Sequence, residues 1–198
     1  MSKKQEDIFS IIEQVGGYEE YQYVEGLKKR ELYFNDEVNL GIINRIVYNI
    51  MKWNREDDLA NIPVEQREKI VLHITSNGGC VISGQAVLDA MEASKTPVKT
   101  VGIAVCASMG AYLLMGGHER ECHKNTTILL HDGSLQLSST SKKAKDTMRY
   151  YDELEARMKK FVLDKTKITE EVYDEKADEE WYMFGDQALE LGIVDKLI

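Results

Sequence analysis

The sequence contains few of the residues that mark disulfide-linked, metal-bound or exported proteins. Its three cysteines, Cys80, Cys106 and Cys122, form no Cys-x-x-Cys pair, which argues against a zinc ribbon and a thioredoxin motif. An odd number of cysteines in 198 residues also argues against a disulfide framework, and reduced thiols favour a cytoplasmic location. The first twelve residues have no long apolar run and no cleavage signature, so we expect no signal peptide.

The chain also lacks an excess of positive charge. It has 25 basic and 34 acidic side chains, for a formal net charge of −9 at pH 7. Phosphate backbones and anionic lipid surfaces attract basic faces, so we expect neither nucleic acid nor a membrane as a partner. With 43% hydrophobic and 30% charged residues, the composition excludes a disordered tail and fits a globular domain.

One uncharged run is nearly long enough to span a membrane. Residues 100–117 form 18 consecutive uncharged positions, but the run includes Ser108 and several glycines. We interpret it as a buried strand that leads into a buried helix, and the charges at Lys99 and Glu119 close it at the surface.

Apolar strands and amphipathic helices alternate along most of the chain. We expect strands at 31–34, 70–75, 98–105, 122–124, 127–130 and from Ile193, and helices at 5–15, 36–51, 81–94, 108–115, 141–165 and 186–191. In the helix at 36–51, Leu40, Ile43, Val47, Ile50 and Met51 should share one face. Residues 18–30 are polar and aromatic with no clear period, and we expect residues 53–68, which include Pro63, to form a charged connection. Because strands alternate with helices, the pattern predicts an α/β fold with a mostly parallel sheet.

The longest predicted helix, 141–165, has one apolar face and one charged face. Its apolar positions recur every three or four residues: Ala144, Met148, Tyr151, Leu154, Met158, Phe161 and Val162. Such a stripe either faces the core or contacts another copy of the chain. The segment that follows, 170–180, is acidic, and a run of charges is usually a solvated face.

Ser108 lies among small residues, in the segment CASMGA at 106–111, where a strand is expected to meet a helix. A nucleophile at that point would have the unpaired N–H groups of a helix N-terminus beside it. The same position would also suit a small residue required for packing or an N-cap. Ser108 alone does not decide between these interpretations.

Two histidines and a glycine pair are further candidates. His131 ends an apolar strand, near the carboxyl edge where α/β sites gather, although a turn histidine would fit as well. His73 lies inside a strand and is more consistent with a structural role. Gly78 and Gly79 would let the backbone approach a neighbouring segment and present its N–H groups, or would form an ordinary turn. No nucleotide-binding glycine motif surrounds them.

A metal site is not expected. His118, Cys122 and His123 are close in sequence, but a fourth ligand and a recognised ligand spacing are both missing.

The order of these features is more specific than any one of them. Ser108 follows Gly79 by 29 residues, His131 follows Ser108 by 23, and an acidic segment comes later. Over residues 31–198 the chain resembles the proteolytic subunit of the Clp protease family. The segments that carry the resemblance are TSNGG at 75–79, ASMGA at 107–111, ILLH at 128–131 and QALELGIVD at 187–195.

The resemblance implies a fold and a serine peptidase site. The fold is α/β, of the ClpP/crotonase-like type, with repeated ββα units, a mostly parallel sheet and a protruding long helix. Ser108 would be the nucleophile, and His131 the general base and then the acid. The amides of Gly79 and Met109 would form the oxyanion hole. The family's third catalytic residue, an aspartate, falls on Glu180. If the loop is offset, Asp178 is the alternative.

The resemblance also implies an assembly and a partner. Helix 141–165 would interlock two stacked seven-membered rings of identical chains, a tetradecamer that degrades unfolded polypeptides. A separate AAA+ unfoldase of the ClpX, ClpA or ClpC type would feed these chains and alone use ATP, so the chain itself needs no cofactor. Residues 1–30 do not resemble the family's N-terminal segment. We treat them as a separate segment that could contact the partner, and 31–198 as the peptidase domain.

The chain departs from the family pattern at several positions. Asn77 replaces a proline, and Asp132-Gly133 replaces the Gln-Pro that follows the histidine. The added carboxylate of Asp132 should disfavour acidic substrate residues. Glu180 replaces an aspartate and is one methylene longer, so the backbone there must adjust.

Three other functions compete with the peptidase. A weak or inactive ring subunit would have a structural role, but it would usually have lost Ser108 or His131. An acyl-CoA hydratase or isomerase of the crotonase type shares the fold, yet it needs no Ser–His pair and requires cationic contacts for CoA. A metal-dependent hydrolase lacks an adequate ligand set. We therefore predict an active serine endopeptidase.

Overall fold

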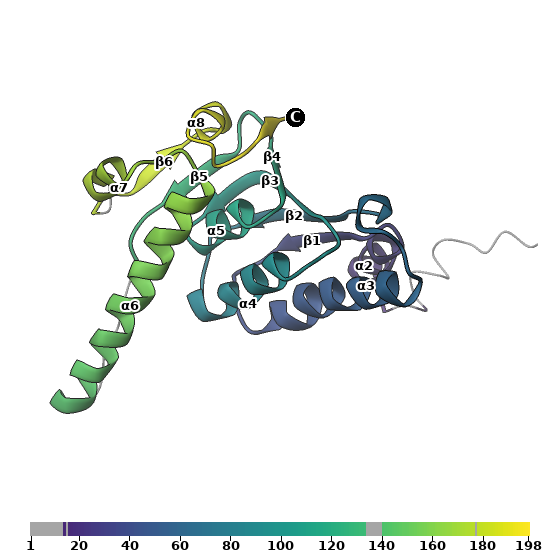
Figure 1. Ribbon diagram of the computed structural model, residues 1–198, viewed down its shortest axis with the longest axis horizontal. Helices are drawn as coiled ribbons and strands as arrows, with labels where there is room; N and C mark the ends of the chain where they lie inside the picture. Colours follow the sequence, from purple (N-terminus) through teal and green to yellow (C-terminus); the bar gives the residue numbers. More distant parts are fainter. Residues whose placement is uncertain (1–13, 15, 134–139, 177) are drawn as a thin grey trace, which may run out of the picture.

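The computed structural model describes residue 14 and residues 16–133, 140–176 and 178–198. The helix expected at 5–15 lies almost entirely outside these residues. In the described part, helices pack against a seven-stranded sheet, and one long helix projects away from the body (Figure 1). The predicted α/β class is therefore confirmed.

The sheet is parallel except at one edge. The main path runs β1 (Glu31–Asn35), β2 (Ile70–Ser76), β3 (Val98–Ala107), β4 (Glu119–Cys122) and β7 (Lys196–Leu197). All of these neighbours pair in parallel. The first half of β3 pairs with β4, and its last residues pair in parallel with β5 (Thr127–Leu130). β6 (Trp181–Met183) then joins β5 as the antiparallel strand.

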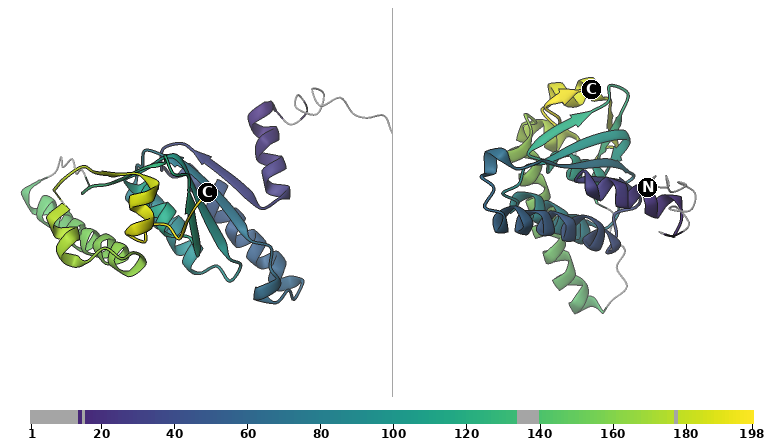
Figure 2. Two further views of the ribbon diagram at one scale, coloured as in Figure 1. Left: turned by 90° about the horizontal axis from the view of Figure 1, so that it is seen from above. Right: turned by 90° about the vertical axis from the view of Figure 1, so that its right-hand side faces the viewer.

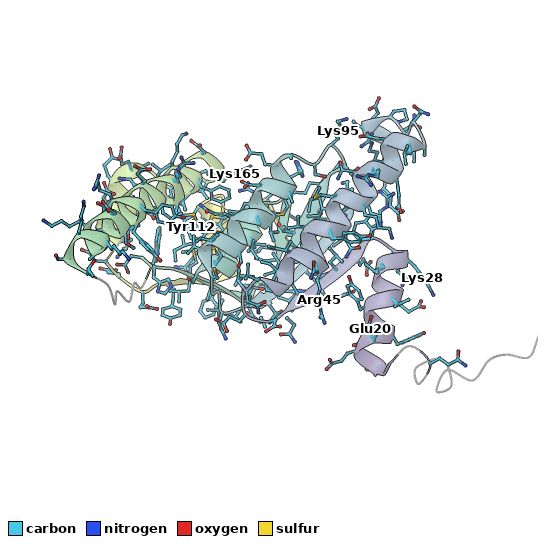
Figure 3. The ribbon with its side chains drawn as sticks, turned by 90° about the horizontal axis from the view of Figure 1, so that it is seen from below. Glu20, Lys28, Arg45, Lys95, Tyr112 and Lys165 are labelled. Atoms are coloured by element: carbon cyan, nitrogen blue, oxygen red, sulfur yellow. The ribbon has the colours of Figure 1, made fainter. Side chains whose placement is uncertain are left out.

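The helices have the following bounds: α2 Tyr18–Lys28, a π-helical stretch Ile43–Val47 that continues into α3 Tyr48–Leu59, a 3-10 turn Val64–Gln66, α4 Val81–Glu92, α5 Met109–Met115, α6 Ser141–Lys165, α7 Glu170–Lys176 and α8 Gly185–Glu190. Figure 3 shows α3 and α4 side by side, with α6 at one end of the molecule and α2 at the other.

The core lies between the sheet and the helices packed on it. β2 alternates strictly, with Ile70, Leu72 and Ile74 fully buried and the residues between them half-buried. Every residue of α5 is buried. The uncharged run at 100–117 is thus a strand that leads into a core helix, as predicted. No described helix is both long and apolar enough to cross a membrane.

Two stretches for which no helix was predicted contain one. α2 occupies 18–28, where Tyr23 and Leu27 pack on the core. α3 extends through the supposed connection as far as Leu59. It buries Trp53 and Asp57, and Asp57 pairs with Arg30 at 2.6 Å. The hydrophobic period of α3 is not visible in the sequence because the carboxylate of Asp57, paired with Arg30, occupies an inward-facing position.

The face predicted for the helix at 36–51 is correct at Ile50 and Val47, which face the core, but wrong at its two ends. Ile42, Ile46 and Ile50 are buried, whereas Leu40 is 72% and Met51 63% exposed. Positions four residues apart share one face of a helix, and this buried face is displaced from the predicted one. The stretch Ile43–Val47 between Ile42 and α3 is π-helical.

The C-terminal elements also differ in part from the expected ones. The strand expected at 122–124 lies at Glu119–Cys122, and the terminal strand lies at Lys196–Leu197 rather than from Ile193. Ile193 is a fully buried core residue instead. β6 was not expected, because its three residues are too few to show a period.

The helix α6 is divided along its length. Leu154 and Val162 are buried, and the Phe161 ring lies 5.9 Å from the ring of Tyr112 in α5. The N-terminal half projects from the body, and Met148 there is 45% exposed (Figure 1). The apolar stripe therefore faces the core in its C-terminal half only.

Candidate active site

Ser108 occupies a strained turn between β3 and α5. Its φ of 52° and ψ of −126° lie in a region that side chains rarely adopt. Such a conformation costs about 1–3 kcal/mol, so its surroundings must hold it in place. A strained strand-to-helix turn is also how many hydrolases expose a nucleophilic serine. The Ser108 side chain is half-exposed here, beside the buried Met109.

Two neighbouring segments hold this turn. The Ser108 N–H donates to the Leu129 carbonyl at 2.9 Å, which ties the turn to β5. On the other side lies Gly78, whose φ is +100°. A Cβ at Gly78 would lie 2.7 Å from the Ser108 Cβ and 3.0 Å from the Met109 nitrogen. Only glycine fits this contact, because a methyl group would displace Ser108.

The two predicted oxyanion donors, the amides of Gly79 and Met109, lie on neighbouring segments. Val38 forms an isolated parallel bridge with Gly79. The Val38 N–H donates to the Gly78 carbonyl, and the Val38 carbonyl accepts from the Cys80 N–H, each at 2.7 Å. This pattern leaves the N–H of Gly79 directed away from Val38. Met109 is the first residue of α5, and its N–H has no partner within the helix. Both amides can therefore donate to a further acceptor.

His131 contacts Glu180 at the start of β6. The Nδ1 atom of His131 lies 3.0 Å from Oε1 of Glu180. The register of the β5–β6 pair explains this contact, because Leu130 faces Trp181 and the next pair across the strands is His131 with Glu180. The histidine side chain is 28% exposed and the glutamate side chain 58%. Asp178 lies two residues further from this pair.

The catalytic assignments of these residues stay predictions, but the topology brings them to one edge. Ala107 pairs with Leu129, so Ser108 and His131 follow the ends of adjacent parallel strands. Among the described residues, the His131 ring hydrogen-bonds Glu180 and forms no hydrogen bond with the Ser108 hydroxyl. Such bonds are often long in substrate-free enzymes and tighten when substrate binds.

The other candidate residues lie elsewhere. His118 accepts the Val98 N–H through Nδ1 at 3.0 Å, and Cys122 is buried, which raises its thiol pKa to about 11. His73 stacks on Tyr33 with ring centroids 4.4 Å apart, and burial lowers its pKa. Within the described ranges, no three His, Cys, Asp or Glu side chains form a group that could hold a metal ion.

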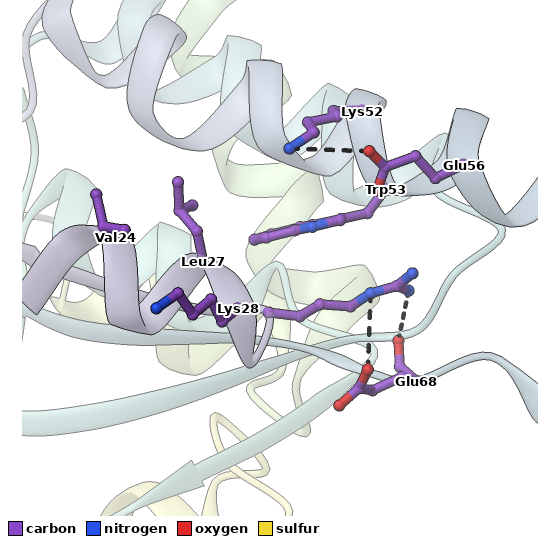
Figure 4. A pocket seen from close by; sticks show the side chains of 8 residues that line it. Val24, Leu27, Lys28, Lys52, Trp53, Glu56 and Glu68 are labelled. Atoms are coloured by element: carbon purple, nitrogen blue, oxygen red, sulfur yellow. Dashed lines mark hydrogen bonds and ion pairs between the residues drawn. The ribbon is translucent and has the colours of Figure 1, made fainter. Parts of the chain in front are cut away.

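Two hollows in the described surface lie away from these residues. One, of about 420 Å³, lies between α2 and α3 around Trp53, with Lys52 and Glu56 paired at its rim at 3.8 Å (Figure 4). The other, of about 980 Å³, follows β1 beneath α2, which stands off the sheet in Figure 2. Neither is lined by Ser108, His131 or Glu180.

One segment at the sheet edge that carries Ser108 and His131 was not predicted from the sequence. Residues 36–38 follow β1 and lie against Gly79, where Val38 O is 2.5 Å and Glu37 Cγ 2.9 Å from the position of a Gly79 Cβ. The sequence holds no sign of this contact, because it depends on the parallel pairing of β1 with β2.

Comparisons with known proteins identify the family to which the chain is similar. A family model described as Clp protease matches residues 13–198, a range that includes α2. Curated relatives named "ATP-dependent Clp protease proteolytic subunit 2" include a protein of Bifidobacterium longum (strain NCC 2705). It is 29% identical, over 87% of this chain and 80% of its own length. The relative from Thermobifida fusca (strain YX) is 30% identical, over 87% of this chain and 82% of its own.

Proposed function

Because the chain belongs to the Clp protease family, we propose that this Clp-type peptidase is a serine endopeptidase that cleaves through Ser108, His131 and Glu180. The observation that carries the proposal is the 3.0 Å contact of His131 with Glu180, on the strand next to the strained Ser108 turn. A carboxylate on Nδ1 keeps that nitrogen protonated and leaves Nε2 free to accept a proton from the serine.

The mechanism follows from these positions. The Ser108 Oγ attacks the scissile carbonyl while His131 takes its proton, and the imidazolium is stabilised by Glu180. The negative oxygen of the tetrahedral intermediate would accept hydrogen bonds from the Gly79 and Met109 amides. His131 then protonates the leaving amine, and a water molecule activated by the same ring releases the acyl group from Ser108.

We further propose that copies of the chain stack as two rings around a closed chamber. The exposed apolar half of α6 supports such a contact, because an unpartnered Met148 and its neighbours would be buried against the facing ring. Unfolded polypeptides would then enter only when a separate AAA+ unfoldase threads them. The chain carries no nucleotide-binding motif, so ATP hydrolysis belongs to that partner.

A fluorophosphonate probe tests the nucleophile directly. We expect labelling of the intact protein at Ser108, mapped by mass spectrometry, and no labelling of Ser108→Ala. The same variant should lose peptide cleavage by about four orders of magnitude or more, with unchanged sedimentation. A folded and assembled protein that is not labelled would contradict the proposal and favour an inactive ring subunit.

A further inference from the structure

Five chain segments meet at the edge of the sheet that carries Ser108. The strands lie in the order β1, β2, β3, β5 and β6. Parallel strands bring their carboxyl ends to the same edge, and the antiparallel β6 brings its beginning there. The edge therefore presents Glu37, Gly79, Ser108, His131 and Glu180 in sequence across the sheet.

Glu37 is held on one side of the nucleophile. Its Cγ lies 2.9 Å from the position of a Gly79 Cβ, so the side chain rises directly beside the glycine that carries a predicted oxyanion donor. The bridge between Val38 and Gly79 fixes this placement. Glu37 is exposed, and within the part of the chain that the structure describes its carboxylate has no ion-pair partner.

Asp132 lies on the other side. It directly follows His131, and its side chain is exposed, again without an ion-pair partner among the described residues. Other acids lie along this edge as well. Glu180 contacts His131, Glu179 pairs with Lys176 at 2.8 Å, and the Asp36 carboxylate accepts the Glu37 N–H at 2.7 Å. Glu37 and Asp132 are distinguished by their placement, because Glu37 lies beside Gly79 and Asp132 directly follows His131, so these exposed carboxylates flank Ser108.

We propose that Glu37 and Asp132 are specificity-determining residues that select polypeptide segments with Lys or Arg close to the cleaved bond. The inference rests on the proposed peptidase function and names its substrate class. β1 lies two strands from β3, which is about 10 Å, and an extended peptide advances about 3.3 Å per residue. The basic residue should therefore lie within about three positions of the scissile bond.

The expected effect is moderate. Exposed ion pairs are weak individually, and each contributes about 2- to 5-fold in affinity. Two such contacts predict a preference of about tenfold for a basic over an acidic peptide. Because the Debye length falls from about 30 Å at 0.01 M salt to about 3 Å at 1 M, the preference should disappear at high salt.

Three peptides of one sequence, with Lys, Gln or Glu on both sides of the cleavage point, test the proposal. For the intact protein at low salt we expect kcat/KM in the order Lys, Gln, Glu. The double variant Glu37→Gln/Asp132→Asn should bring the Lys-to-Glu ratio close to one. Glu65→Gln is the matched control, because it removes one exposed carboxylate before β2, at the opposite end of the strand from the site. It should retain the wild-type ratio.

Binding separates this inference from the proposed function. Affinities of the three peptides for Ser108→Ala, measured by fluorescence anisotropy, do not require turnover. Preferential binding of the Lys peptide without any cleavage by the wild-type protein would contradict the serine peptidase but support the recognition of basic segments. Equal affinities and equal rates would overturn the inference. So would a preference that persists in the double variant or at high salt.

Discussion

Ser108 and Gly78 touch where β2 and β3 end, and each requires the conformation of the other. A serine with φ of 52° persists only if its neighbours leave no alternative, and Gly78 packs so closely that a Cβ there would lie 2.7 Å from the Ser108 Cβ. Asp178, Glu179 and Glu180 are chemically similar, yet only Glu180 faces His131. At the scale of single residues, the candidate site therefore depends on backbone position more than on residue type.

Gly78→Ala tests the first of these contacts. The new methyl group would meet the Ser108 Cβ at 2.7 Å and displace the nucleophile. A misplacement of about 1 Å can cost about 100-fold in rate, so we expect a loss of that order in peptide cleavage. Gly16→Ala is the control: its φ of +96° is similar, but no atom lies within 4 Å of the added Cβ. Equal activity of the two variants would contradict the packing argument.

Glu180→Gln tests the second contact. Replacing the carboxylate removes a charge-assisted hydrogen bond to the imidazolium, which is typically worth about 1.5–3 kcal/mol. We expect kcat to fall by about 10- to 100-fold, measured on a fluorogenic peptide. Asp178→Asn, two residues away, should change kcat little. If Asp178→Asn proves the more damaging change, Glu180 is not the third member of the triad.

The helix α6 shows how a single element divides between two environments. Its C-terminal half packs on α5 through Phe161 and Tyr112, whereas its N-terminal half leaves Met148 and Tyr150 45% and 47% exposed. A uniform apolar stripe in the sequence cannot show where a helix leaves the body of the protein. The structure shows that point, and the projecting half is the part that is free for another copy.

Tyr151→Asp tests the role of the projecting half. The substitution places an unpaired charge on the apolar stripe, and burying that charge in a ring contact would be costly. We expect double rings to dissociate into single rings or smaller species, seen by sedimentation velocity. Ala156→Asp adds the same charge at an exposed position of the same helix and should sediment as the parent does. A Tyr151→Asp protein of unchanged size would contradict the interface.

At the scale of the whole molecule, an ion-pair network joins the first elements of the chain to the body. Arg30, between α2 and β1, binds both oxygens of Asp57 in α3 at 2.6 and 2.8 Å. Thr96, before β3, donates a third hydrogen bond to the same carboxylate at 2.7 Å. The Asp57 side chain is only 1% exposed, so its carboxylate is hydrogen-bonded to protein groups rather than to solvent.

This network predicts how stability depends on pH. The hydrogen bond from Arg30, followed by that from Thr96, lowers the pKa of Asp57 in the folded state. A lowered pKa contributes stability that is present above the unfolded value of about 3.9 and is lost as pH falls through the folded value. Asp57→Asn should therefore cost about 3–5 kcal/mol at neutral pH, because it leaves Arg30 without its buried partner.

Urea unfolding at neutral and acid pH measures this difference. The difference in unfolding free energy between Asp57→Asn and the wild-type protein should narrow as pH falls below about 4. There the Asp57 carboxylate is protonated first in the unfolded state, which destabilises the wild-type fold relative to it. Asp152→Asn, an exposed change on α6, is the control and should cost less than about 0.5 kcal/mol. If the difference in unfolding free energy does not change with pH, packing rather than charge explains the loss of stability in Asp57→Asn.

Much of the fold can be predicted from the sequence, because apolar period and glycine position are local signals. The run 100–117 predicts a strand followed by a buried helix, and helix α6 has the predicted bounds. Prediction fails where the local signal is absent or misleading. The helix after β1 buries Ile42 and Ile46 rather than Leu40 and Met51, and the paired Asp57 occupies an inward-facing position of α3.

The sequence by itself determined the residue types of the candidate site, their order along the chain and the family. Short motifs at characteristic spacing can be recognised from the sequence alone. Only the tertiary structure decided which acid faces His131 and that Glu37 flanks the nucleophile. Both depend on strand pairing between segments far apart in the chain, β5 with β6 and residues 36–38 with Gly79. Pairing register is a property of the folded backbone, and a shift of one residue would direct every side chain to the opposite face.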